Sequence, residues 1–145
     1  MPDFDRERIE ISIGIDTSGS IGQEELNDFI SEIVGIAKAY KDKIEMTLYA
    51  HDTEVQSEHK VENGSIEKIK QLKIKGGGGT SHKDVMDRIA KDRRECKLAV
   101  FFTDGDSDLQ DIDFGKYRYG KLFVLNKNGN DEQLKGKQAQ VVKLK

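Results

Sequence analysis

The chain carries the sequence ISIGIDTSGSI at residues 11–21. Isoleucines at every second position, with small residues between them, predict a strand over residues 9–15 that is buried on both faces. Asp16 ends this strand, and Ser18 and Ser20 follow at intervals of two residues. A carboxylate and two hydroxyls are oxygen ligands of the kind that hard divalent cations prefer. We therefore expect a central strand that delivers a cation site to one edge of a sheet.

Helical and strand patterns alternate along the remaining sequence. Apolar residues recur every three or four positions over residues 23–41, which predicts an amphipathic helix with acids in its first turn. A short helix is expected at residues 65–72, and another from Ser81 to about Arg94. The run at residues 54–61 is polar and predicts an edge strand. Strands are expected at residues 44–50, 54–61, 97–103, 121–125 and 139–144, the first two forming a hairpin.

This order of elements predicts an α/β fold in one domain, residues 1–145. The sheet is expected to be mostly parallel, with one antiparallel edge strand, right-handed crossovers and helices on both faces. In such sheets, ligands bind beyond the carboxyl ends of the strands. Five polar segments are expected to meet at this edge, namely residues 16–20, 51–52, 76–81, 104–108 and 126–130.

Composition restricts the classes of partner. The 24 basic and 27 acidic residues give a formal net charge of -3 and are mixed along the chain, so no polycationic surface for nucleic acid is expected. Apolar runs fall short of the roughly 20 residues of a membrane span, and the N-terminus does not resemble a secretory signal. The single cysteine, Cys96, precedes an apolar run and is expected in the core. We expect a cytoplasmic protein that binds neither nucleic acid nor membrane.

The polar segments offer a consistent set of metal ligands. These are two carboxylates and three hydroxyls, with no clustered Cys or His to favour zinc, so Mg²⁺ or Mn²⁺ is the expected ion. An ion held largely by neutral hydroxyls keeps positive charge and an exchangeable position, which an anionic oxygen of a partner can fill. The glycines at residues 76–79 allow the third segment to pack closely over the site. The predicted ligands are Asp16, Ser18, Ser20, Thr80 and Asp104.

Three of the five predicted ligands also have a purely structural interpretation. Ser20 could be a helix N-cap, Thr80 a polar loop residue and Asp104 a turn residue before glycine. Asp106 and Asp108 are interpreted as a solvated acidic rim, because clustered charges usually face water.

The histidines and one further acid are assigned by their place in the chain. His51 follows a predicted strand and is the histidine expected to approach the site edge, where Asp52 could also contribute. His59 and His82 are isolated in the sequence and are interpreted as surface residues.

Three motifs together carry a family resemblance: DxSxS at residues 16–20, GGGGT ending at Thr80, and TDG containing Asp104. In this order and strand context they resemble the metal ion-dependent adhesion site of von Willebrand factor A (VWA) domains. IDTSGSI, GGGGT and the closing VVKLK are similar to the VWA-like domain found behind metallopeptidase-like domains in bacteria and phages. The resemblance implies a three-layer Rossmann-like fold, a Mg²⁺ or Mn²⁺ site, and binding of a protein that presents a carboxylate. A metallopeptidase-like or ATPase partner is one option it raises, but HExxH is absent, so protease activity is not implied.

Other classes of function fit part of the same pattern. A Mg²⁺-dependent phosphoryl-transfer enzyme or a Toprim-like nucleic-acid enzyme would also place acids after strands. The haloacid dehalogenase pattern needs a second acid where Ser18 stands, and a Toprim site needs a glutamate where Asp16 stands. The segment GGGGTS lacks the lysine of a P-loop. A structural domain with an empty site is the third alternative, and a non-enzymatic binding module is the preferred hypothesis.

Overall fold

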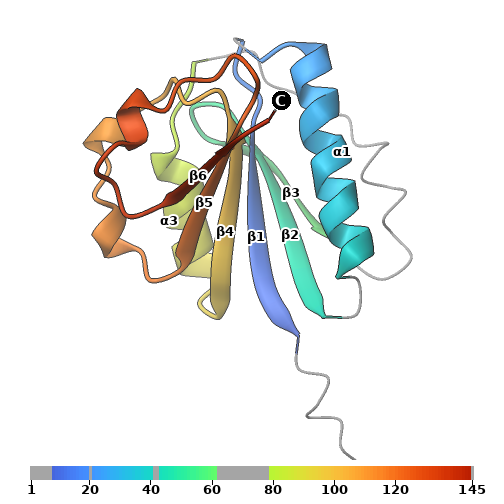
Figure 1. Ribbon diagram of the computed structural model, residues 1–145. Helices are drawn as coiled ribbons and strands as arrows, with labels where there is room; N and C mark the ends of the chain where they lie inside the picture. Colours follow the sequence, from blue (N-terminus) through green and yellow to red (C-terminus); the bar gives the residue numbers. More distant parts are fainter. Residues whose placement is uncertain (1–7, 20, 41–42, 62–78, 145) are drawn as a thin grey trace, which may run out of the picture.

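A mostly parallel sheet forms the centre of the protein (Figure 1). The computed structural model describes residues 8–19, 21–40, 43–61 and 79–144. Within these residues, six strands lie in the order β3-β2-β1-β4-β5-β6, and the pair β2 and β3 is antiparallel while the other pairs are parallel. The strands are β1 (Ile9–Asp16), β2 (Ile44–His51), β3 (Val55–Val61), β4 (Cys96–Thr103), β5 (Gly120–Leu125) and β6 (Gln140–Lys143).

Strand β1 lies at the middle of the sheet, as its alternating isoleucines predict. Ile13 pairs with Leu48 of β2 on one side and with Val100 of β4 on the other. Gly14 is required on the opposite face, because a Cβ there would lie 2.8 Å from the ring of Phe101. The absent side chain therefore lets the Phe101 ring pack directly against the central strand.

In the described part of the chain, two α-helices cover the two faces of the sheet (Figure 1). Helix α1 (Gln23–Ala39) packs Phe29 and Ile33 into a cluster with Ile13, Ile15, Leu48, Val100 and Phe102. Helix α3 (Lys83–Asp92) packs Val85, Met86 and Ile89 into the second cluster, with Tyr49, Phe101 and Phe123 of the sheet. Neighbouring residues of β4 point to opposite faces, so the single run of apolar residues in this strand supplies both cores.

Short 3₁₀ helices replace α-helical crossovers near the C-terminus. They are η2 (Leu109–Asp111), η3 (Phe114–Lys116) and η4 (Glu132–Leu134). Leu109, Phe114 and Leu134 from these segments are buried in the cluster on the α3 face. A long connection without an α-helix therefore still covers that face of the sheet.

The predicted fold class is confirmed, with small changes at the element ends. The first helix ends at Ala39, and the helix expected from Ser81 runs from Lys83 to Asp92. The antiparallel edge strand is β3, as predicted from its polar sequence. Cys96 is buried, as expected. The helix predicted at residues 65–72 lies outside the described residues.

None of the helices in the described part of the chain is both long enough and apolar enough to cross a membrane.

Replacing Ile13 by alanine is expected to lower the free energy of unfolding by about 2–5 kcal/mol. The side chain is fully buried, so its truncation removes buried apolar area and leaves a cavity in the core. Ile9, on the same strand, is 52% exposed and provides the control. Urea denaturation of Ile13→Ala and Ile9→Ala measures both effects. Equal losses in the two variants would contradict the central placement of β1.

Candidate functional site

Five segments meet at the carboxyl ends of the parallel strands, which form the upper edge of the sheet in Figure 1. Backbone hydrogen bonds join them in sequence-distant pairs. Thr17 N donates to His51 O at 2.8 Å, Ser81 N to Asp52 O at 2.9 Å, and Asn130 N to Asp104 O at 2.9 Å. The predicted convergence is therefore confirmed for the described parts of these segments, which do not include Ser20 or residues 76–78.

Asp16 is fully buried at the end of β1, and its carboxylate is held from two sides. Thr103 Oγ1, at the end of β4, donates to Asp16 Oδ2 at 2.7 Å, and the amide of Ser18 donates to Oδ1 at 2.9 Å. Thr103 Oγ1 also accepts from Gly105 N at 3.2 Å. Each carboxylate oxygen has two lone pairs, so the two bonds fix the group and leave it able to accept further donors.

Ser18 follows Asp16 and is 2% exposed, so its hydroxyl lies inside the same edge. The neighbouring Thr17 Oγ1 donates to His51 O at 3.0 Å, which ties the start of this turn to the end of β2. Ser20, the next predicted ligand, lies outside the described residues.

Asp104 follows β4 and is half-buried. Its Oδ1 accepts from Asp106 N at 3.0 Å, closing a tight Asx turn. Gly105, in this turn, has φ of +85°, and a Cβ there would lie 2.0 Å from Asn130 O. The glycine after Asp104 is therefore required by both backbone conformation and space.

Thr80 is half-buried in the loop that leads into α3, and the residues after it are firmly anchored. Asp108 accepts from Ser81 Oγ at 2.6 Å and from His82 N at 2.8 Å. Asp108 is half-buried and its carboxylate is an acceptor for the Thr80 loop, so it has a structural role that the prediction of a solvated rim did not include. Asp106 is exposed, in agreement with that prediction.

His82 is fully buried, so its interpretation as a surface residue is wrong. The sequence did contain a signal, because His82 lies on the same helical face as Val85, Met86 and Ile89 at spacings of three, four and seven residues. His59 is exposed, as predicted.

His51 and His82 form a buried pair beneath the loops. Their rings meet edge to face with centroids 4.8 Å apart. His51 Nδ1 lies 3.1 Å from Ser81 O, and His82 Nδ1 lies 2.7 Å from Ser107 Oγ. Burial lowers the pKa of both imidazoles, although the charge of Asp16 partly opposes the shift at His51. Both rings are therefore held in the neutral form at pH 7.

Asp52, the acid that could contribute from the hairpin, is engaged within its own turn. Its Oδ1 accepts from Glu54 N at 3.3 Å and from Gln56 Nε2 at 3.0 Å. This carboxylate shapes the β2 to β3 turn, while its backbone carbonyl anchors Ser81.

Among the described residues, no group of three or more His, Cys, Asp or Glu side chains is arranged to hold a metal ion. The predicted site has a different composition, with two carboxylates and three hydroxyls. Four of its five residues, Asp16, Ser18, Thr80 and Asp104, come from segments that meet at the sheet edge.

The strand order and the polar edge define a VWA-like α/β domain. The family model described as VWA-like domain (DUF2201) matches residues 11–141. The chain therefore belongs to this VWA-like family, which confirms the resemblance inferred from DxSxS, GGGGT and TDG.

An uncharacterized protein of Thermotoga maritima is 38% identical over 125 residues, which cover 86% of this chain and 29% of that protein. The chain thus spans less than a third of the length of this relative.

Solved structures support the fold. Proximal thread matrix protein 1 from the mussel byssus superposes with a TM-score of 0.70 at 12% identity, over 94% of this chain and 41% of that one. An aerotolerance-related membrane protein from Bacteroides fragilis, bearing multiple mutations to serine, superposes with a TM-score of 0.54 at 13% identity. The superposition covers 81% of this chain and 67% of that one. At these identities the likeness concerns the fold.

Asp108→Ala is expected to lower the free energy of unfolding by about 1.5–3 kcal/mol, because it leaves donors of Ser81 and His82 without their charged acceptor. Amide hydrogen exchange at His82 should accelerate as well. Asp106→Ala is the matched control, and its exposed side chain should change stability by less than about 0.5 kcal/mol. Unchanged His82 exchange in Asp108→Ala would contradict the anchoring role.

Proposed function

We propose that this domain is a metal-dependent protein-binding module, in which Mg²⁺ or Mn²⁺ takes an acidic oxygen from a partner protein. The observation that carries the proposal is the fully buried carboxylate of Asp16, oriented by Thr103 and Ser18 at the edge where the segments that carry Thr80 and Asp104 also lie. The residues that would hold the ion are Asp16, Ser18, Ser20, Thr80 and Asp104.

The surroundings of Asp16 favour a cation. A buried ionised group needs a compensating charge or several hydrogen bonds, because it has lost its hydration. Within the described residues, no Lys or Arg forms an ion pair with Asp16, and the two nearby histidine rings are held neutral by burial. A divalent ion would supply the missing positive charge, with carboxylates binding directly or through water.

The protein groups fix the site before any partner arrives. Thr103 orients the Asp16 carboxylate, and the turn at Gly105 orients Asp104. Asp108 holds the loop that carries Thr80. Because these groups are already ordered, binding of the ion and of a partner would lose less conformational entropy. When bound, the ion would supply an electrophilic position for a partner's carboxylate oxygen.

We propose no catalytic step at this site. General acid-base or nucleophilic catalysis needs a side chain within hydrogen-bond reach of the reacting group and a base matched to it. His51 Nδ1 faces the backbone carbonyls of Asp52 and Ser81, and its buried Nε2 has no hydrogen-bond partner among the described residues, so no nucleophile is matched to this imidazole. This arrangement favours the binding module over the phosphoryl-transfer alternative.

Mg²⁺ or Mn²⁺ is expected to stabilise the fold by about 2.7 kcal/mol at a hundredfold excess over the dissociation constant, because binding to the native state alone shifts the equilibrium. Thr80→Ala should reduce this gain while leaving metal-free stability nearly unchanged, since a half-buried loop hydroxyl contributes little packing. Melting curves with millimolar Mn²⁺ and with EDTA measure both quantities, and Asp106→Ala serves as the control. Superimposable curves for the unmodified protein would count against a metal site.

Partner binding is tested by affinity capture from the native host in Mg²⁺, repeated in EDTA and with Thr80→Ala. A specific partner should be retained by the unmodified protein and by Asp106→Ala, and lost in the other two cases. Replacing single Asp and Glu residues of that partner should then identify the carboxylate that meets the ion. Capture that is indifferent to EDTA would favour the structural-domain alternative.

A further inference from the structure

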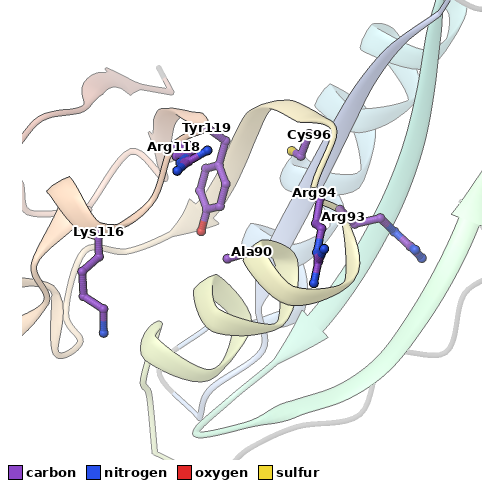
Figure 2. A pocket seen from close by; sticks show the side chains of 7 residues that line it. All are labelled: Ala90, Arg93, Arg94, Cys96, Lys116, Arg118 and Tyr119. Atoms are coloured by element: carbon purple, nitrogen blue, oxygen red, sulfur yellow. The ribbon is translucent and has the colours of Figure 1, made fainter.

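A separate cavity lies at the opposite end of the sheet from the candidate metal site, between the C-terminal end of α3 and the segment that enters β5 (Figure 2). Its volume is about 310 Å³. Ala90, Cys96 and Tyr119 form its weakly polar wall, and Arg94, Lys116 and Arg118 supply three cationic side chains, whereas the side chain of Arg93 turns away toward Glu58. We name this cavity, with these seven residues, the basic pocket.

The cations of the basic pocket are not neutralised by its own lining, which contains no Asp or Glu. Arg93 is occupied, because its Nη2 lies 2.6 Å from Glu58 Oε2. Arg94 and Arg118 form no ion pair within the described part of the chain.

Asp87 is the acid whose charge acts on Lys116 of the basic pocket, but its carboxylate also has other partners. Its carboxylate accepts from Lys83 Nζ and from the hydroxyl of Tyr117, so it neutralises Lys116 only in part. The pocket therefore retains an excess of positive charge that an anion could balance.

Helix-dipole stabilisation explains some of these residues but not all. Cations just after α3 interact favourably with its C-terminal carbonyls, which accounts for Arg93 and Arg94. Lys116 and Arg118 come from a different segment more than twenty residues further along the chain. Their convergence on the same cavity needs another explanation.

The segment that carries Lys116 and Arg118 is held rigidly. Tyr117 and Tyr119 alternate with them and are buried, and Tyr119 Oη donates to Met86 O at 2.9 Å. Lys121 Nζ donates to the carbonyls of Tyr117 and Tyr119 at 2.8 and 2.9 Å. This bracing fixes the backbone and presents the two cations on the outside of the segment, so a ligand need not order the backbone on binding.

We propose that the basic pocket binds a small phosphate-bearing ligand with an apolar or aromatic body, of which a mononucleotide is the simplest example. The planar guanidinium group of arginine can donate two parallel hydrogen bonds to two oxygens of one phosphate. The three available cations, Arg94, Lys116 and Arg118, suit a group with more than one negative charge. The volume is at the lower end of the range for small-molecule sites. Ala90, Cys96 and Tyr119 provide the surface for the body of the ligand.

The cations are gathered around one cavity in a chain of net charge -3, with Asp92 and Glu95 beside them in sequence. A nucleic acid requires a longer basic surface than this. A small ligand therefore fits the charge distribution better than a polymer.

Binding is tested by calorimetry and by ¹⁵N–¹H NMR with AMP, ATP, inorganic phosphate and citrate, all in EDTA. The chelator keeps divalent ions away from Asp16 and its neighbours, so the result is independent of the proposed metal site. AMP and ATP should bind more tightly than inorganic phosphate or citrate, and amide shifts should cluster at residues 90–96 and 116–119.

The double variant Arg94→Gln/Arg118→Gln should weaken AMP binding at least tenfold. Lys38→Gln is the matched control, because Lys38 is an exposed cation in the last turn of α1, and it should leave binding unchanged. Shifts confined to the loops of the metal edge, no binding of AMP or ATP, or equal binding to the double variant would overturn the proposal. Citrate binding as tightly as AMP would overturn the phosphate class, and tighter binding of an RNA oligonucleotide would favour a polymer instead.

Discussion

The hydrogen bond between Thr103 Oγ1 and Asp16 Oδ2 is the constraint on which the candidate site depends. It joins the ends of two neighbouring strands whose residues are 87 positions apart, and it lies fully inside the protein. A buried carboxylate that lost this donor would keep an oxygen without its hydrogen-bond partner after losing its hydration on folding. The bond therefore ties the ends of β1 and β4 together and fixes the direction in which the Asp16 carboxylate faces.

Packing on both sides of the sheet makes that constraint possible. Ile13 and Ile15 belong to the α1 core, whereas Gly14 lets Phe101 press on the same strand from the α3 side. Because close-packed interiors do not deform continuously, the end of β1 has one position relative to β4. The chemistry at the edge thus rests on apolar contacts several residues away from it.

A second layer of polar contacts holds the loops over the edge. Asp108 binds the segment after Thr80, and the neutral pair of His51 and His82 fills the space beneath it. A fully buried imidazole is compatible with this packing only when uncharged, because ionisation in an apolar setting is costly. The site is therefore supported by side chains that we do not propose as metal ligands.

The sequence by itself determined the strand and helix order, the central position of β1, and the segments that meet at one edge. These features follow from local periodicity and from chain direction in parallel sheets, both of which can be read in a short window. Only the tertiary structure decided that Asp108 holds the loop after Thr80 and that His82 packs against His51 and Phe101, because these contacts join segments that are distant in sequence. The same holds for the basic pocket, since residues 93–94 and 116–118 become neighbours only when α3 packs beside the segment entering β5.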